Sequence, residues 1–298
     1  MKHKKLYAIF LCTLVTTIFS FHYIVAKLIL TAGVSQYSLS AWRGLLGGGI
    51  LLIIYHKKIS LKIIKENVFV LFMVAFLGFF INQILFMKGL SLTTPLYVAI
   101  ISNTIPIITA IFAFVVGLER PNMKKIIGIL ITFSFVSYLI IEKQNGHTAD
   151  GFFNLGNTLI LLNVIAFSLA FIFGKKLLKK DFPYELLTGI MLFGGGIMMS
   201  LVAQERMSDI ITYATANTLN FSYIIFEILI STSIVYLLNL KALQLMDITK
   251  VSFFIYLQPI ITGIGDFIIN GHKPGPELYF VFIGILIGAY LVVMQKSD

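Results

Sequence analysis

The stretch that decides the fold is Ile81–Ile108, INQILFMKGLSLTTPLYVAIISNTIPII. It predicts the end of one apolar helix, a short connection and a second helix with Pro106 inside its apolar run. The same layout returns at Ile234–Ile261, IVYLLNLKALQLMDITKVSFFIYLQPII, where a shift of 153 residues places Pro106 on Pro259. The chain therefore contains an internal repeat, which governs its architecture.

A second pair of segments supports the repeat. Phe19–Lys27, FSFHYIVAK, resembles Phe167–Lys175, FSLAFIFGK, at a shift of 148 residues. We therefore expect two halves, residues 1–145 and 151–298, each built from the same set of helices.

The composition is that of a membrane protein. Hydrophobic residues make up 58% of the 298 residues and charged residues only 12%, whereas soluble domains carry roughly 25% charged residues. The apolar runs are of about 17–22 residues, long enough to cross ~30 Å of hydrocarbon as helices. The sequence predicts an all-α integral membrane protein with ten transmembrane helices, at residues 6–26, 38–55, 67–87, 95–117, 125–141, 156–174, 185–203, 221–240, 251–270 and 278–294.

The distribution of basic residues predicts the orientation. With the N-terminus inside, 17 Lys and Arg residues fall on the inner side and 5 on the outer side. This bias places both termini in the cytoplasm, and we expect a multi-pass protein of the bacterial inner membrane. The basic start Lys2–Lys5 precedes an apolar run without an Ala-x-Ala cleavage site, so we interpret that run as a retained first span.

An odd number of spans in each half has a consequence for topology. Five spans carry the chain across the membrane, so the second half enters from the opposite side and is inverted relative to the first. Inverted halves around a midplane site are typical of secondary transporters, in which the two halves exchange conformations to open alternate sides.

The residues also match a family in their order. The first copy contains Phe19–Tyr23 ending in Lys27, Arg43, Gly89-Leu90 with Pro106 downstream, Glu119-Arg120 and Gly128, and the second contains Ala242-Leu243, Pro259 and Gly284. In the order of these residues the chain resembles the EamA-like branch of the drug/metabolite transporter superfamily. The resemblance implies a ten-helix fold with a central cavity. It also implies that the protein exports amino acids or related metabolites. The chain departs from it at His272, where a Glu is usual, and at His22, where a small polar residue is common.

Polar side chains within the predicted spans are the candidate substrate contacts, because such groups are costly in lipid and usually face the bundle interior or a cavity. The alternative is that they form hydrogen bonds between helices. Amides beside Pro106 and Pro259 suit an ammonium or carboxylate of a solute, since each proline frees backbone carbonyls. The predicted substrate-binding residues are His22, Tyr23, Asn82, Gln83, Tyr97, Asn103, Asn163, Phe167, Tyr236, Asn239, Tyr256 and Gln258.

Ionisable side chains within the spans are candidates for coupling transport to protons. They are His22, Glu227 and Asp266, with Arg43 as a residue that tunes a carboxylate. The alternative for Arg43, Glu227 and Asp266 is a structural ion pair or snorkelling to the interface. Facilitated diffusion without coupling fits the sequence equally well.

Other classes of function find little support. The net charge of +10 is explained by orientation in the bilayer, and no basic stripe indicates nucleic-acid binding. The single Cys12 excludes a disulfide framework or a cysteine metal site. Gly263–Asp266 matches a Gly-x-Gly-Asp protease signature, but no second aspartate lies in a predicted span, so we expect no catalytic residue. We expect no cofactor.

The sequence thus predicts a secondary transporter of a small polar metabolite, most simply an exporter of an amino acid or related solute, with lipid as its other partner. A nucleotide-like or S-adenosylmethionine uptake exchanger is the alternative within transport, and an intramembrane enzyme or a scaffold is the alternative outside it. Glycine pairs Gly44/Gly48 and Gly284/Gly288 have the spacing for close helix packing. We expect a monomer, with a dimer through span ten as the alternative.

Overall fold

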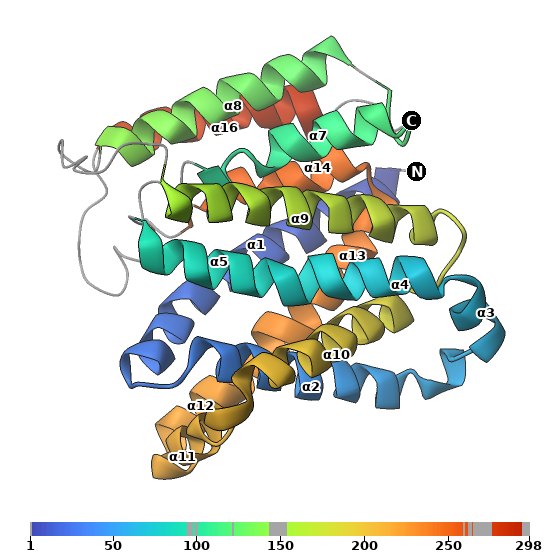
Figure 1. The fold of residues 1–298 in the computed structure, drawn as a ribbon. Helices are drawn as coiled ribbons and strands as arrows, with labels where there is room; N and C mark the ends of the chain where they lie inside the picture. The colour runs from blue at the N-terminus through green and yellow to red at the C-terminus, as the bar shows by residue number, and fades with distance from the viewer. Residues whose placement is uncertain are drawn as a thin grey trace. The chain divides into compact units, whose positions relative to one another are not determined.

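The computed structural model describes residues 2–93, 98, 101–120, 122–142, 154–258, 260–261, 264 and 276–293, and all regular elements in these ranges are helical (Figure 1). The chain divides into two compact units. Unit 1 comprises Met1–Ile84 and Leu169–Leu245, and unit 2 comprises Leu85–Ser168 and Met246–Asp298.

Unit 1 contains the longer series of elements. It begins with α1 Lys2–Thr31, α2 Gln36–Ile54, η1 His56–Lys58, α3 Leu61–Glu66, α4 Val68–Ala75, η2 Phe76–Phe80 and the start of α5 Ile81–Leu92. It continues with the end of α9 Leu155–Leu178, then α10 Tyr184–Ala203, η3 Gln204–Arg206, α11 Asp209–Ala216, α12 Thr218–Ile225, η4 Phe226–Ile234 and α13 Val235–Leu245.

Unit 2 takes the remaining elements. They are the end of α5, α7 Ile105–Val115, α8 Met123–Glu142, the start of α9, α14 Ile248–Phe253, η5 Phe254–Leu257 and α16 Pro276–Val293. Each unit thus draws its helices from both predicted halves of the sequence, and the boundaries at 1–145 and 151–298 stay a prediction.

The described helices are those of a multi-pass membrane protein. Six of them are long and apolar enough to cross a bilayer, and shorter apolar helices cover Ile105–Val115, Ile248–Leu257 and Tyr279–Val292. Every predicted span overlaps helix within the described residues. The number ten stays a prediction, because parts of spans four and nine lie outside the described ranges.

Two long helices of unit 1 contain a π-helical segment, in which the turn is wider than in an α-helix. η2 follows α4 directly, and η4 joins α12 to α13. The shift of 153 residues carries Phe76–Phe80 onto Leu229–Ser233, which lies inside η4. The two irregular segments therefore occupy corresponding positions of the sequence repeat.

A second irregularity recurs in unit 2. A turn at Asn103-Thr104 interrupts helix ahead of Pro106, which occupies the first turn of α7 where its missing N–H leaves no helical bond unmade. The corresponding residues in the second half fall in the 3₁₀ segment η5, just before Pro259. Span four, which the sequence predicts as one helix over residues 95–117, is thus interrupted at Asn103-Thr104.

Helices α2 and α10 pack closely in unit 1 because glycines lie at their contact. A Cβ added at Gly44 would lie 2.6 Å from the Gly196 Cα, and one added at Gly196 would lie 2.5 Å from the Leu45 backbone N. In unit 2, α16 packs on α8, and a Cβ at Gly288 would overlap the Thr132 hydroxyl. Both glycine pairs named from the sequence therefore serve packing within the chain.

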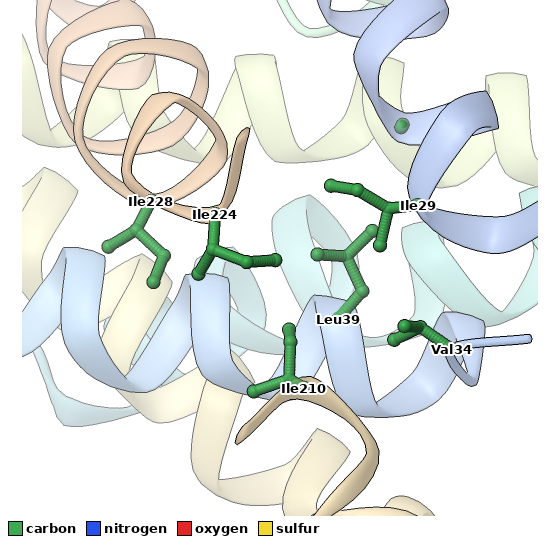
Figure 2. Close-up of a cluster of buried hydrophobic side chains, with 7 residues drawn as sticks. Ile29, Val34, Leu39, Ile210, Ile224 and Ile228 are labelled. Atoms are coloured by element: carbon green, nitrogen blue, oxygen red, sulfur yellow. The ribbon is translucent and has the colours of Figure 1, made fainter. Parts of the chain in front are cut away.

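An apolar cluster joins α1, α2, α11, α12 and η4 in unit 1. Figure 2 shows Ile29, Val34, Leu39, Ile210, Ile224 and Ile228 converging from these elements, and all are buried. Residues 204–220, which the sequence predicts to be a polar connection, thus contain the helix α11, anchored by Ile210.

Candidate functional site

Three ionisable side chains meet inside unit 1, each from a different element. His22 comes from α1, Arg43 from α2 and Glu227 from the π-helical segment η4. The His22 Nδ1 lies 2.8 Å from Glu227 Oε2 and 2.9 Å from Oε1. The Arg43 Nε lies 3.4 Å from Glu227 Oε2. We call these residues the His–Arg–Glu cluster.

Hydroxyl groups of η4 complete the cluster. The Thr232 hydroxyl donates to the Glu227 carbonyl oxygen at 2.7 Å and accepts from Arg43 Nε at 2.8 Å. The Ser231 hydroxyl lies 3.0 Å from Glu227 Oε2. The wider π-turn brings the hydroxyl of residue i+5 to a carbonyl oxygen, as at Thr232 and again at Ser233, which donates to Ile228 O at 2.9 Å. Single π-turns of this kind are frequent at functional sites.

Burial distinguishes the three ionisable residues. The side chains of Arg43 and Glu227 are 1% and 0% exposed, whereas that of His22 is 11% exposed. Arg43 therefore does not snorkel to the interface, and it pairs with Glu227. A coupling role for Glu227 stays a prediction. His22 is the least deeply buried member of the cluster.

The chemistry of the cluster follows from its donors. An ionised carboxylate only accepts hydrogen bonds, so the His22 Nδ1 facing Glu227 carries a proton. One guanidinium balances one carboxylate, and a buried pair of this kind is tolerated only when further hydrogen bonds satisfy both groups. Histidine is the side chain whose unperturbed pKa lies nearest to neutral pH, and a neighbouring carboxylate, here that of Glu227, stabilises the imidazolium form.

Aromatic and amide side chains lie next to the cluster. Phe19 makes edge contacts with His22 and with Tyr236, at centroid distances of 6.2 and 5.9 Å. Tyr236 is buried and hydrogen-bonded to Gln83. Gln83 also accepts from the Ser40 hydroxyl at 3.3 Å and donates to Asn82 at 3.5 Å.

The structure thus brings five of the fourteen predicted residues together in unit 1. His22, Asn82, Gln83, Tyr236 and Glu227 all belong to unit 1 and lie in or beside the His–Arg–Glu cluster. Asn239, half-buried, follows Tyr236 by one turn of α13.

Unit 2 holds five other predicted residues. Asn103 is buried in the turn before α7, Asn163 is buried on α9, Phe167 packs against the cluster of Val98, Ile101, Ile105, Ile160 and Val164, and Gln258 is half-buried after η5. Tyr256 in η5 is fully buried, and its hydroxyl has no hydrogen-bond partner among the described residues. That these residues line a cavity stays a prediction.

Three of the predicted positions cannot be placed. Tyr97 and Asp266 lie outside the described residues, as does the side chain of Tyr23. A coupling role for Asp266 therefore stays a prediction.

A second buried ion network lies in unit 2, and the sequence did not indicate it. Lys125 Nζ lies 3.2 Å from both Glu119 Oε2 and Asp247 Oδ2, and Lys250 Nζ lies 2.9 Å from the same Asp247 oxygen. Glu119 also accepts from the Thr249 backbone N–H at 2.9 Å. The network ties the connection between α7 and α8 to the start of α14.

The sequence analysis missed the lysines of this network and the hydroxyl groups beside Glu227, each for a physical reason. Lys125 and Lys250 are among the 17 basic residues that the sequence places on the inner side of the membrane, yet their side chains are each 1% exposed. Ser231 and Thr232 are ordinary small polar residues in a span, and only their position next to Glu227 in Ser-Thr-Ser could have marked them. Among the described residues, no group of three or more His, Cys, Asp or Glu side chains could hold a metal ion.

The sequence matches the EamA-like transporter family over residues 6–141 and again over residues 154–294. The chain belongs to the EamA-like transporter family. Two relatives from Bacillus subtilis are named as uncharacterized transporters. Uncharacterized transporter YyaM of Bacillus subtilis is 25% identical over 99% of this chain and 93% of its own length. Uncharacterized transporter YetK of the same species is 24% identical over 78% of this chain and 70% of its own length.

A plant protein and a solved structure are also similar to this chain. The WAT1-related protein At2g40900 of Arabidopsis thaliana is 23% identical over 92% of this chain and 75% of its own length. A crystal structure superposes with a TM-score of 0.74 over 98% of both chains at 14% identity. That structure shares the fold with this EamA-like chain.

Proposed function

We propose that this EamA-like protein is a secondary transporter of the bacterial inner membrane that moves a small polar metabolite by alternating access. The observation that carries the proposal is the His–Arg–Glu cluster, buried among helices that are apolar enough to span a bilayer. An ionisable group in such a position is expensive and is retained for a function or for a paired structural role. His22, the partly exposed member, adds a group that can exchange a proton.

An inverted duplication is the second part of the proposal. It is supported by the two ranges that match the family, by the corresponding π-helical segments and by the interrupted helices before Pro106 and Pro259. Each compact unit also takes corresponding parts of both halves. Two structurally related halves of opposite orientation give a transporter two exchangeable conformations.

We infer that the solute carries both an amine and a carboxylate, as an amino acid does, and that export is the direction. In unit 1 the amides of Asn82 and Gln83 and the hydroxyl of Tyr236 suit such a solute. In unit 2 the amide of Asn103 does so as well, and the Tyr256 hydroxyl, which has no hydrogen-bond partner among the described residues, offers a buried donor. A nucleotide-like solute would need free cationic groups in the spans. Arg43, the strongest such candidate, is bound to Glu227.

Reconstitution in liposomes tests the proposal. Labelled amino acids, amines and nucleotides are offered to purified protein with and without a pH gradient, and we expect saturable flux or counterflow for an amino acid. His22→Gln keeps a polar side chain but cannot be protonated, so it is expected to weaken the response to the pH gradient more than it weakens counterflow. Flux of no small solute would contradict the carrier hypothesis.

A matched substitution isolates the role of the cluster. Glu66→Gln removes a carboxylate from the exposed end of α3 in the same unit and should leave flux unchanged. Equal pH responses of the wild-type protein and His22→Gln would remove His22 from the coupling mechanism while leaving transport itself intact.

A further inference from the structure

The connection between α2 and α4 forms a short basic element that the transport mechanism does not use. It runs from Tyr55 to Asn67 and contains η1 and α3, which Figure 1 shows between the ends of α2 and α4. Both flanking helices are long and apolar enough to belong to membrane-spanning segments. The thirteen-residue connection is therefore held near the membrane surface at both ends.

The lysines of this element are exposed, and most have no acidic partner. Lys58 pairs with Glu185 at 2.7 Å. Within the described part of the chain, Lys57, Lys62 and Lys65 form no ion pair. Glu66 is the single acidic residue between Tyr55 and Asn67. The element thus presents three uncompensated positive charges in nine residues.

Apolar side chains accompany these charges. Leu61 is 72% exposed, and Ile59 and Ile63 are 41% and 39% exposed. In α3, Leu61 and Ile64 share one side at a spacing of three residues, and Lys62 and Lys65 share another at the same spacing. This combination of apolar and basic faces is typical of segments that lie in the interface of a bilayer.

We propose that Lys57, Lys62 and Lys65 form a binding surface for anionic phospholipid headgroups, with Leu61 inserted among the adjacent acyl chains. Basic residues beside a membrane span attract anionic lipids with about 1 kcal/mol each, which is about fivefold in local lipid concentration. The partner is a phosphodiester headgroup with a net negative charge, as in phosphatidylglycerol. The inference is independent of the transported solute.

The neighbouring pocket is a poorer site for an anion. It has a volume of about 270 Å³ and is lined by Ile63, Glu66, Asn67, Leu177, Lys180, Asp181 and Phe182. Two carboxylates on its rim, Glu66 and Asp181, oppose a phosphate. The lysine face of α3 is therefore the surface to test.

A fluorophore on the element can report which lipids gather there. Cys12 is buried, so Ser60→Cys provides a reactive thiol beside α3, at a side chain that makes no capping hydrogen bond. The labelled protein is reconstituted in phosphatidylcholine vesicles that contain spin-labelled phosphatidylglycerol or spin-labelled phosphatidylcholine, and quenching by the two lipids is compared. We expect the phosphatidylglycerol analogue to be enriched by at least about fivefold, which is the effect of a single lysine, and less at high salt.

Two variants separate charge from structure. In Lys57→Gln/Lys62→Gln/Lys65→Gln the two analogues should quench almost equally, whereas Lys57→Arg/Lys62→Arg/Lys65→Arg should keep the enrichment because it keeps the charge. Equal quenching in the wild-type protein, or enrichment that survives the glutamine substitutions, would overturn the proposal. Because these side chains are exposed, neither variant is expected to disturb the fold.

Discussion

The carboxylate of Glu227 is stable within a membrane span only when hydrogen bonds and a compensating charge satisfy it. It accepts hydrogen bonds from His22 and Ser231 and balances the charge of Arg43, and it has no solvent contact. Removing one member of such a pair leaves a buried charge without compensation, which typically costs about 3–5 kcal/mol, whereas removing both costs far less. The cluster should therefore behave as a unit.

A double-mutant cycle at Arg43 and Glu227 tests this coupling. We expect Arg43→Gln and Glu227→Gln each to lower the free energy of unfolding by about 3–5 kcal/mol, and the double variant to regain most of that loss. Thermal unfolding of the purified protein in one detergent provides the measurement. Losses that simply add in the double variant would mean that the two residues do not act as a pair.

Asp181 has a backbone conformation that is unfavourable for most residues other than glycine. It follows the end of α9 with a φ of 57°, in the left-handed region, where a side chain other than glycine costs about 1–2 kcal/mol. Asp181→Gly should therefore stabilise the protein by about 1 kcal/mol, measured as a higher melting temperature. Asp181→Ala removes the same carboxylate but keeps the Cβ, so it should give no such gain.

At the scale of the elements, α2 and α10 approach as closely as their glycines allow. A Cβ at Gly48 would overlap the Phe193 backbone, whereas a Cβ at the neighbouring Gly49 would lie 3.7 Å from the Phe193 ring, an ordinary contact. Gly48→Ala should therefore destabilise the protein by about 1–3 kcal/mol. Gly49→Ala, with its better helix propensity, should be neutral or slightly stabilising. Equal melting temperatures for the two variants would contradict the close contact between α2 and α10 at Gly48.

The connection between α7 and α8 is held by the buried ammonium of Lys125, which pairs with both Glu119 and Asp247. Lys125→Gln should leave Glu119 without this cation and Asp247 with Lys250 alone, and lower the free energy of unfolding by about 3–5 kcal/mol. Lys124, its exposed neighbour, is the matched control, and Lys124→Gln should change stability by less than about 0.5 kcal/mol. Both are compared by thermal unfolding. A similar small change in the two variants would show that the network contributes little.

Sequence patterns predicted the helices and the glycine contacts because both depend on composition and local spacing. Long apolar runs identify spans, and glycines four apart identify close packing. The π-turns at Phe76–Phe80 and Phe226–Ile234 and the short helices α3 and α11 were not predicted, since no local composition marks them. The exact ion pairs were also missed, because Lys125 and Glu119 meet Asp247 only through tertiary structure.

At the scale of the whole molecule, the proposed inversion of the two halves makes a prediction about which side of the membrane each connection faces. The shift of 153 residues carries Lys62 in α3 onto Thr215 in α11, so the two connections occupy corresponding places in the two halves. Inverted halves place corresponding connections on opposite faces of the membrane, whereas parallel halves place them on the same face. The basic connection should be the cytoplasmic one, because it carries Lys57, Lys58, Lys62 and Lys65.

Cysteine labelling in intact cells separates these topologies. Ser60→Cys and Thr215→Cys each add an accessible thiol to a chain whose own Cys12 is buried. We expect a membrane-impermeant maleimide to label Thr215→Cys in intact spheroplasts and to label Ser60→Cys only after the membrane is permeabilised. Labelling of both thiols from the outside, or of neither, would mean that the halves are parallel. The reverse pattern would keep the inversion and place the termini outside, because each end of the chain is linked to these connections by a fixed number of crossings.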